Sequence, residues 1–413
     1  MLTRSIKQSE IPVVADIQAR AFRSDAARYR EVYRSGGRVG WRNLRLLESD
    51  AGEAVAVSKV FHRNMSLNGG VLPAGLIGSV AVAPEHRRRG HAGRMMDSLL
   101  SEFYDLGTPI SLLFPFSATW YRNRGYGMAN FNRYIEIPPR LIPDYPERLL
   151  VRRARPGDRS NMRILYENSL GDPRNNGWLS RGDWEWENRL WSKEDYEIVV
   201  YEGNAGVEGY LVYWLVWNDD MSQAKVIEWV WQNDEAWRGL AGFLSALGDQ
   251  FRTVAMNAAA HEPLLTALSP PYDPSTGTVE FVFFPNSRVI SGFMLRVVHI
   301  KNALRQRSFP PDVTAHFHLS IEDAQLPGNT RPLCVHIADG SAGVQELDGS
   351  PPAEERQLMV ETDIATFSEL YTGLVSAEQA RTVGRLLATD DVCNKLTSSF
   401  RTAPLNMWPT DWF

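Results

Sequence analysis

The chain has 413 residues, of which 44% are hydrophobic and 23% are charged, and its formal net charge is -5 at pH 7. This length is enough for two or three domains, each with a buried core. The net negative charge excludes a general affinity for nucleic acid or for an anionic membrane. Two cysteines are too few for a disulfide scaffold, no run approaches the roughly 20 apolar residues that span a bilayer, and the first residues lack the apolar core of a signal peptide, so we expect a cytoplasmic protein.

The first block, residues 1–145, alternates stretches that are typical of helices and of strands. Apolar residues recur with helical spacing over residues 11–34, and the stretches 55–61 and 74–77 predict two strands separated by a turn at 68–70. An apolar run bounded by prolines at 109–116 predicts a buried strand. This mixture predicts a layered α/β domain.

A basic loop with glycines lies between the strand predicted at 79–83 and the helix predicted after Gly90. Backbone N–H groups at the start of a helix suit an anionic diphosphate, and a glycine lets the ligand approach the backbone. The pattern Arg87-x-x-Gly90-x-Ala92 resembles the pyrophosphate loop of the GCN5-related N-acetyltransferases, which holds acetyl-coenzyme A. No Gly-Lys-Ser/Thr follows, and the dinucleotide fingerprint is absent. The alternative is a solvated basic turn before an ordinary amphipathic helix.

The second block, residues 146–285, follows a proline-dense linker at 137–146 and is rich in tryptophan. Strands are predicted at 196–201, 207–216 and 225–231, in the order found in the first block. Where a basic glycine loop would stand, residues 231–240 are acidic instead. We therefore predict a degenerate second copy of the same architecture that does not bind the cofactor.

The third block, residues 286–413, begins with a strand-like stretch at 296–300 and a predicted helix at 301–307. The remaining elements predicted are strands at 314–321, 333–338, 341–346 and 357–361 and a helix at 377–388. Helices on an antiparallel sheet make an α+β module, and this order resembles a sterol-carrier-protein-2-like domain.

The end of the chain is unusually apolar, with Trp408, Trp412 and Phe413 among its last six residues. Most chain termini are polar, and an aromatic tail exposed to solvent would form an apolar patch prone to aggregation. The tail is therefore predicted to be buried and to bring the α-carboxylate of Phe413 into the protein. Such a carboxylate suits a base that accepts a proton from an attacking amine.

Tyr121 stands four residues before Gly125-Tyr126, which fits the Tyr-x-x-x-Gly-Phe/Tyr segment of the GCN5-related acetyltransferases. In acyl transfer from a thioester the departing sulfur needs a proton, and a phenol with a pKa near ~10 can supply it. The alternative is a tyrosine that only packs its ring, as most tyrosines do.

Across its whole length the chain resembles the enhanced-intracellular-survival (Eis) acetyltransferases, with an active acetyltransferase domain, a degenerate one and a sterol-carrier-like domain. The resemblance rests on Val80–Pro84, His86–Gly90, the Tyr121 segment and the terminal Phe413. It implies that Tyr121 is the proton donor, that the Phe413 carboxylate is the general base, and that acetyl-CoA and an amine are the substrates. It also implies homohexamers.

The same resemblance implies three groups of cofactor-binding residues. Backbone groups of one strand hold the acetyl-pantetheine arm, the loop grips the pyrophosphate, and a segment before Tyr121 lines the cleft. These are, in turn, Val80, Ala81 and Val82; Arg88, Arg89, Gly90, His91, Ala92 and Gly93; and Phe116 and Ser117. Trp412 stands where relatives often have an acid, and Phe116-Ser117 replaces a serine–acid pair, so the resemblance leaves the identity of the acceptor amine open.

The sequence is also compatible with other functions. A non-catalytic sensor or lipid carrier could use the fold as a scaffold, and an acyl group other than acetyl is not excluded by sequence. His316 and His318 lie on one face of a predicted strand, with His336 further along, and could hold zinc. No cysteine or acid completes an obvious ligand set in the sequence, so no metal is predicted.

Overall fold

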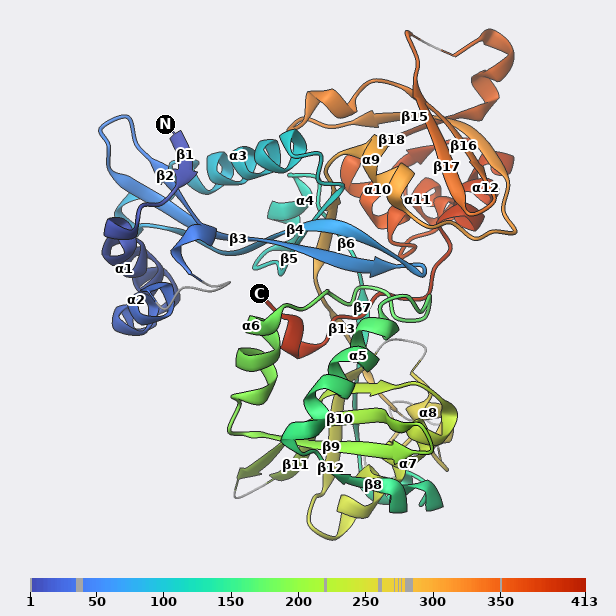
Figure 1. The fold of residues 1–413 in the computed structure, drawn as a ribbon. Coiled ribbons are helices and arrows are strands. Elements are labelled where there is room, and N and C mark those ends of the chain that lie inside the picture. Colours follow the sequence, from blue (N-terminus) through green and yellow to red (C-terminus); the bar gives the residue numbers. More distant parts are fainter. Residues whose placement is uncertain are drawn as a thin grey trace.

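The computed structural model describes residues 2–34, 40–218, 221–258, 262–270, 272–273, 275, 277–278, 285–349 and 351–413. Within these residues the strands form three sheets, and each sheet is the centre of one lobe of the molecule (Figure 1). The chain therefore has the three-part α/β and α+β organisation that the sequence predicts.

The first sheet has seven strands and is covered by helices on both faces. Its strands are, in spatial order, β1 (Leu2–Ser5), β2 (Leu44–Glu48), β3 (Ala54–Leu67), β4 (Gly70–Val82), β5 (Ile110–Leu113), β14 (Met294–Val297) and β6 (Gly127–Met128). Helix α1 (Ile11–Phe22) buries Val14 and Ile17 on one face, and α3 (His91–Asp105) buries Met96 and Leu99 on the other. The helix predicted over 11–34 is two helices, because Arg23 is left-handed and ends α1 before α2 (Ala26–Arg34).

The second sheet repeats this plan. Its strands are β13 (Arg288–Ser291), β7 (Phe131–Ile137), β12 (Thr253–Ala258), β11 (Met221–Trp231), β10 (Gly206–Asn218), β9 (Tyr196–Gly203) and β8 (Val151–Arg153). The helices are α5 (Arg159–Ser169), α6 (Asp183–Glu185), α7 (Asp234–Ala246) and α8 (Leu264–Ala267). Tryptophans fill much of its core, with Trp178, Trp186, Trp229 and Trp237 all buried.

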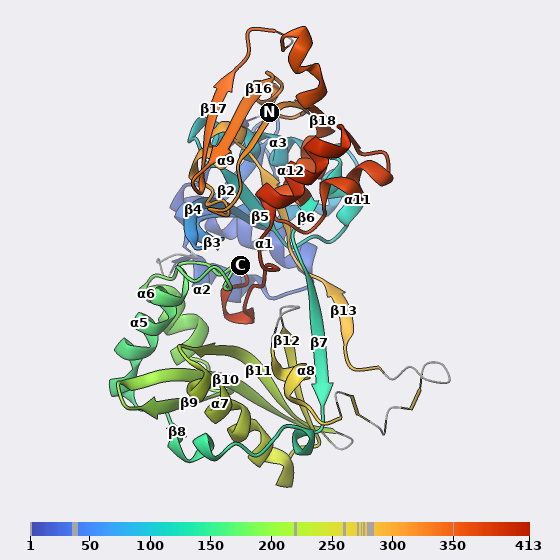
Figure 2. The same ribbon diagram turned by 90° about the vertical axis from the view of Figure 1, so that its right-hand side faces the viewer.

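The first two lobes exchange strands. Strand β7 follows the first sheet in the chain but pairs with β12 and β13 of the second sheet. Strand β14 follows the second sheet but pairs with β5 and β6 of the first. Figure 2 shows β7 and its partner β13 extending from the first lobe to the second. Residues 296–297, which the sequence analysis places at the start of the third block, therefore complete the first sheet. Their apolar pattern predicts a strand but does not specify its partner, because pairing is set by the surface that the chain meets.

The third sheet runs in the order β17 (Ser341–Glu346), β16 (Leu333–Ala338), β15 (Ala315–Glu322), β18 (Met359–Asp363), β19 (Leu386–Leu387). Its helices are α9 (Ile300–Gln306), α10 (Ile364–Tyr371), α11 (Ala377–Thr382) and α12 (Asp390–Phe400). The helix predicted over 377–388 ends at residue 382. Gly384 is left-handed, and the chain then returns to the sheet as β19.

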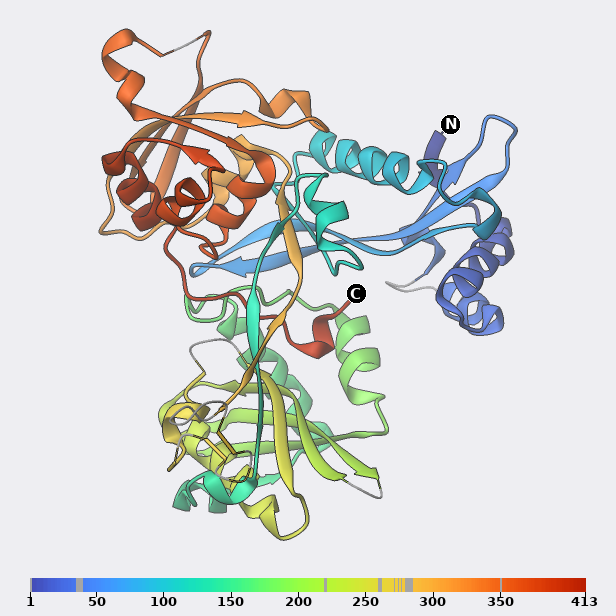
Figure 3. The same cartoon turned by 180° about the vertical axis from the view of Figure 1, so that it is seen from behind.

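After α12 the tail leaves the third lobe and runs to the junction of the first two, where the C-terminus lies (Figures 1 and 3). Residues 405–408 and 410–411 are buried on this path. The predicted burial of the tail is thus observed up to Asp411, whereas Trp412 is 44% exposed and Phe413 is half-buried. None of the helices in the described part of the chain is long and apolar enough to cross a membrane.

Candidate functional site

The candidate site lies where two neighbouring strands of the first sheet separate. Strand β4 pairs with β3 along most of its length but with β5 only from Ala74 to Leu76. Beyond Leu76 the edge of β4 on the side of β5 is no longer paired with β5. Val80, Ala81 and Val82 lie on this released part, so their backbone groups border the opening between β4 and β5. This is the geometry needed to hold an extended amide-containing arm by backbone hydrogen bonds.

A bulge shapes β4 just before these residues. The register between β3 and β4 shifts at Ser58, Ser79 has a φ of +51°, and Gln18 donates a hydrogen bond to the carbonyl of Ser79 at 3.2 Å. A bulge bends its strand and redirects the residues that follow. The strain at Ser79 is thus located at the start of the separated segment.

The basic loop leads from β4 into α3 as the sequence predicts. Arg88, Arg89 and Gly90 are exposed, and Gly90 caps α3 with a φ of +81° and nothing within 4 Å of a Cβ built on it. No side chain caps the helix, which leaves the first N–H groups of α3 to an external acceptor. His91 differs from the expectation in one respect. Its side chain is only 6% exposed, so this residue offers its backbone N–H, not its ring.

Arg124 joins this anion site, although the sequence analysis assigned it no role. A Cβ on Gly93 would lie 2.5 Å from Nη2 of Arg124, so the glycine makes room for the guanidinium against the first turn of α3. The guanidinium also lies 3.8 Å from the ring centroid of Trp120, and its Nη1 donates to the carbonyl of Trp120 at 3.2 Å. The signal in the sequence was Gly93 itself, a small residue in the first turn of a helix that faces the loop.

Tyr121 lies in the short helix α4 (Ala118–Arg122). Ser117 caps the start of this helix, and its hydroxyl accepts a hydrogen bond from the N–H of Trp120. The ring of Tyr121 packs edge-on against Phe116, Trp120 and Tyr126, with centroids 4.8–6.0 Å apart. The Tyr121 hydroxyl has no hydrogen-bond partner among the described residues. Burial raises the pKa of Tyr121 to about 12, and Arg124 partly opposes this, so the hydroxyl keeps its proton at neutral pH.

Tyr126 is a contrasting case. Its hydroxyl is fully buried and shares a hydrogen bond of 2.7 Å with Ser111 of β5. Gly125, just before it, has a φ of +80°, and a Cβ there would collide with the guanidinium of Arg296 from β14. The Gly-Tyr pair of the motif is therefore explained by packing, and Tyr121 alone presents a free hydroxyl. Phe116 lies beside it and is 75% exposed.

The chain end reaches the same opening from the other side. A Cβ on Gly78 of β4 would lie 3.3 Å from the carboxyl carbon of Phe413 and 3.4 Å from its oxygen. The Phe413 ring lies 5.6 Å from that of Phe114, which follows β5. The terminal carboxyl thus occupies the space over Gly78 of β4, one residue before the bulge at Ser79.

A buried charge network anchors the tail. Asp411 is 1% exposed and accepts hydrogen bonds from Arg63 of β3 at 2.7 Å, Arg181 at 2.8 and 2.9 Å, and Tyr166 of α5 at 2.8 Å. Arg181 also binds Glu228 of β11 through two hydrogen bonds. Burial alone would raise the pKa of Asp411, but Arg181 and Arg63 outweigh it and lower the pKa to about 2. Asp411 is therefore an anchor and a poor base.

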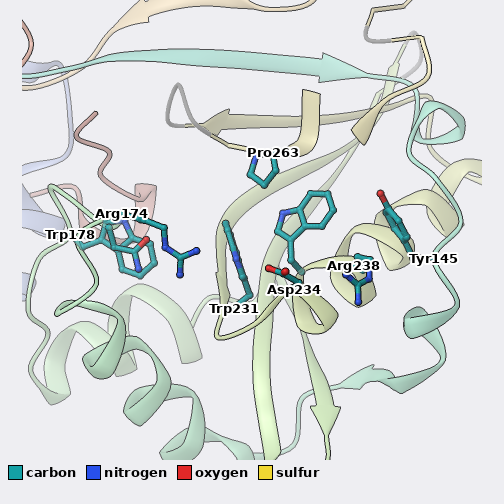
Figure 4. A pocket seen from close by; sticks show the side chains of 9 residues that line it. Tyr145, Arg174, Trp178, Trp231, Asp234, Arg238 and Pro263 are labelled. Atoms are coloured by element: carbon teal, nitrogen blue, oxygen red, sulfur yellow. The ribbon is translucent and has the colours of Figure 1, made fainter. Parts of the chain in front are cut away.

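A cavity of about 340 Å³ occupies the second lobe at the position that corresponds to the cofactor loop of the first (Figure 4). Figure 4 shows Trp178 and Arg174 on one side, Tyr145 and Arg238 on the other, and Trp231 between them. Helix α7 begins here with two acids, Asp234 and Glu235. The two arginines bind their own carboxylates, Asp172 and Glu147, each at 2.6 Å. The wall of this cavity therefore carries acidic residues, and its two arginines are already paired with carboxylates. Such a wall does not suit a pyrophosphate.

Comparison with known proteins identifies the domains. Residues 3–129 and residues 177–297 each match an acetyltransferase (GNAT) domain, and residues 300–408 match a sterol carrier protein domain. Two curated relatives from Streptomyces griseus, both described as uncharacterized N-acetyltransferases, are 24% identical over 366 residues, which is 81% of this chain and 81% of each relative. The predicted fold, two GNAT-fold domains and a sterol-carrier-like domain, is confirmed.

Solved structures with this fold extend along the whole chain. A GCN5-related N-acetyltransferase from Anabaena variabilis has a TM-score of 0.85 at 22% identity and covers 100% of both chains. One from Kribbella flavida has a TM-score of 0.82 at 23% identity and covers 100% of this chain and 98% of its own. Eis1 from Mycobacterium abscessus has a TM-score of 0.78 at 18% identity, with 100% of both chains covered. At these identities the likeness shows the fold.

Proposed function

We propose that this N-acetyltransferase, built from two GNAT domains and a sterol carrier protein domain, transfers the acetyl group of acetyl-CoA directly to a primary amine in a ternary complex. Tyr121 is the general acid and the carboxylate of Phe413 is the general base. The observation that carries the proposal is the position of the Phe413 carboxyl beside Gly78, at the bulge of β4, where a side chain at residue 78 would meet it.

The anion site supports acetyl-CoA as the donor. The uncapped N–H groups of α3 and the exposed Arg88, Arg89 and Gly90 suit the pyrophosphate, and Arg124 adds a cation held against the same turn. The released backbone of residues 80–82 suits the amides of the pantetheine arm. Phe116 and Ser117 flank the arm on the side of α4.

In the proposed chemistry each of the two groups handles one proton. The amine nitrogen forms a bond to the thioester carbon, and the carboxylate of Phe413 accepts the proton that the nitrogen gives up. The carbon–sulfur bond breaks, and Tyr121 donates its proton to the departing sulfur. Because Tyr121 remains protonated at neutral pH, it enters each cycle able to donate. The products are an N-acetyl amine and coenzyme A, and the cycle closes when Phe413 gives its proton to solvent and the Tyr121 phenolate takes one from solvent.

The acceptor binds on the tail side in this proposal. Phe61, Trp184, Arg189, Trp412 and Phe413 border a small cavity of about 20 Å³ beside the terminal residue. This space is too small for a substrate as it stands, since ligand sites usually measure about 300 Å³ or more. Exposed Trp412 and half-buried Phe413 are the parts of its wall that could move to admit an amine.

We also propose a homohexamer, which the sequence resemblance to the Eis acetyltransferases implies, and a cytoplasmic location, which the low cysteine content favours. We expect a homohexamer. Light scattering coupled to gel filtration measures this directly, and a monomeric mass under all conditions would remove the assembly from the proposal.

The enzymatic proposal is tested by release of coenzyme A thiol from acetyl-CoA against a panel of polyamines, lysine peptides, arylalkylamines and aminoglycosides. A chain with a native C-terminus is compared with one that carries an extra Gly-Ser after Phe413 and with one that carries the same residues before Met1. We expect turnover from the native and N-terminally extended chains and a loss of about 100-fold or more from the C-terminally extended chain. Equal turnover of all three would exclude the terminal carboxylate as base.

A further inference from the structure

A group of metal-ligand side chains lies on one face of the third sheet, far from the candidate site along the chain. His316 and His318 are two residues apart on β15, and His318 is directly opposite Cys334 on β16. Facing residues of an antiparallel pair and residues two apart on one strand share a face, so all three side chains project from the same side. Their nearest ligand atoms lie within 4.8 Å of one another.

The contacts within this group are close. Nε2 of His316 lies 3.4 Å from Sγ of Cys334, and the rings of His316 and His318 are 5.3 Å apart. Ligand atoms around a tetrahedral zinc ion are about 3.4–3.7 Å apart, given bonds of about 2.0–2.3 Å. His316 and Cys334 are therefore already at the separation of two zinc ligands, and the ligand atom of His318 lies within 4.8 Å of both.

Glu355 determines which ring nitrogen of His318 is free to bind a metal ion. The segment Ala353–Leu358 covers His318, which is 1% exposed, and Nε2 of His318 lies 2.7 Å from a carboxylate oxygen of Glu355. A carboxylate accepts the N–H, so it holds the proton on Nε2 and leaves the lone pair on Nδ1. Nδ1 of His318 is buried and has no hydrogen-bond partner among the described residues. A buried nitrogen lone pair without a donor is the arrangement of a metal ligand.

We propose that His316, His318 and Cys334 form a zinc site in the sterol-carrier-like domain. His316 binds through Nε2, His318 through Nδ1 and Cys334 through its thiolate, whose proton passes to solvent when the metal binds. Glu355 orients His318 from outside the ligand set, as carboxylates do in many histidine–zinc sites. His316 and Cys334 are partly exposed, so the fourth position is open to water.

The side chains of this group come from three separate segments of the chain. The two histidines and His336 were found in the sequence, but Cys334 and Glu355 were not associated with them. Cys334 lies 16 residues or more beyond the histidines, and Glu355 lies 37 residues from His318. Only the pairing of β15 with β16 and the position of the 353–358 segment bring them together.

The test uses the full, untagged chain, treated with a chelator, desalted, loaded with zinc alone and passed through gel filtration. Zinc per chain is then measured by mass spectrometry of the metal. The two cysteines supply a matched pair of variants, Cys334→Ser and Cys393→Ser, because Cys393 is buried in α12 and belongs to no ligand group among the described residues. His316→Gln provides a second ligand variant at a partly exposed position.

We expect about one zinc per chain in the parent and in Cys393→Ser, and at least a tenfold loss of zinc in Cys334→Ser and in His316→Gln. Loading with Co²⁺ should produce a thiolate-to-cobalt charge-transfer band in the parent that is absent from Cys334→Ser. Circular dichroism separates loss of metal from loss of fold. Folded parent protein that retains no zinc, or folded Cys334→Ser that retains as much as the parent, would overturn the proposal.

Discussion

At the scale of single residues, the site contains two buried tyrosines that differ in one respect. The hydroxyl of Tyr126 is hydrogen-bonded to Ser111, whereas the hydroxyl of Tyr121 has no hydrogen-bond partner among the described residues. A proton donor must be free to meet the reacting atom, so only Tyr121 fits that role. The pair supplies a test in which the chemistry changes and the packing does not.

For Tyr121→Phe we expect kcat to fall by about 100-fold or more, since general acid catalysis usually contributes this much. The affinity for acetyl-CoA should change little, because the ring and its contacts remain. Tyr126→Phe loses one hydrogen bond and should cost about 1 kcal/mol of stability with little effect on kcat. Steady-state kinetics and acetyl-CoA titration measure both variants. Parent-like turnover of Tyr121→Phe would remove it from the mechanism.

Gly125 is required for a different reason, because Arg296 crosses the space that a side chain would fill. Gly125→Ala combines a collision with a φ of +80°, and it should displace a buried guanidinium that binds Asp323 at 2.7 and 2.8 Å. We expect a loss of roughly 3 kcal/mol in the free energy of unfolding. Gly157→Ala, where a Cβ meets nothing within 4 Å, should stay within about 0.5 kcal/mol of the parent in urea unfolding.

At the scale of elements, the C-terminal tail is held in place by the ion pairs of one residue, Asp411. Asp411 fixes it to Arg63 of β3 and to Arg181, and two residues later the terminal carboxyl lies against β4. The position of the proposed base therefore depends on an ion network and not on a helix or strand. Disturbing the anchor should affect both stability and turnover.

For Asp411→Asn we expect a loss of about 3 kcal/mol at pH 7, because two buried cations lose an anion, together with a large fall in kcat. The folded pKa of Asp411, about 2, is below its ordinary value of 3.8. The stability that its charge adds is thus complete above about pH 5 and is lost as pH falls through about 2. The difference between parent and variant should shrink over that interval in urea unfolding followed by tryptophan fluorescence.

The control for this prediction is Asp312→Asn, which removes a pair with Arg401 whose side chains are 62% and 67% exposed. Exposed pairs contribute little, so this variant should stay close to the parent at every pH. A stability difference for Asp411→Asn that does not vary between pH 5 and pH 2 would contradict the proposed ion network.

At the scale of the whole molecule, the first two lobes depend on each other. Each contributes a strand to the sheet of the other, and Arg296 of the exchanged β14 also binds Asp323 beside the third sheet. Residues that form the proposed site thus come from both ends of the chain. The opening proposed to bind acetyl-CoA is built by the first 130 residues, but its sheet is completed near residue 295 and the proposed base is residue 413.

We expect residues 1–137 expressed alone to lack cooperative unfolding and measurable acetyl-CoA binding. Without β14, strand β5 loses its antiparallel partner, and buried Ile135 and Ile137 of β7 have no sheet to enter. Co-expression with residues 138–413 should restore a folded complex. A sharp thermal transition and parent-like affinity in the isolated fragment would show that the exchange is dispensable.

The sequence determined most of the local structure and part of the site. Apolar periodicity predicted the strands near residues 55–82 and 110–113 and the helix after Gly90, because these signals are carried within one element. The basic loop and Tyr121 were found for the same reason, since their residues are close together in the chain. The resemblance to a known family added the order of domains and the role proposed for Phe413.

The tertiary structure decided which distant segments meet. The exchange of β7 and β14, the position of Arg124 against Gly93, and the approach of Cys334 and Glu355 to the histidines were absent from the sequence reasoning. So was the binding of Asp411 to Arg63, which is 348 residues away. Backbone propensity acts over a few residues, whereas sheet partners and buried ion pairs depend on surfaces that exist only after the chain has folded.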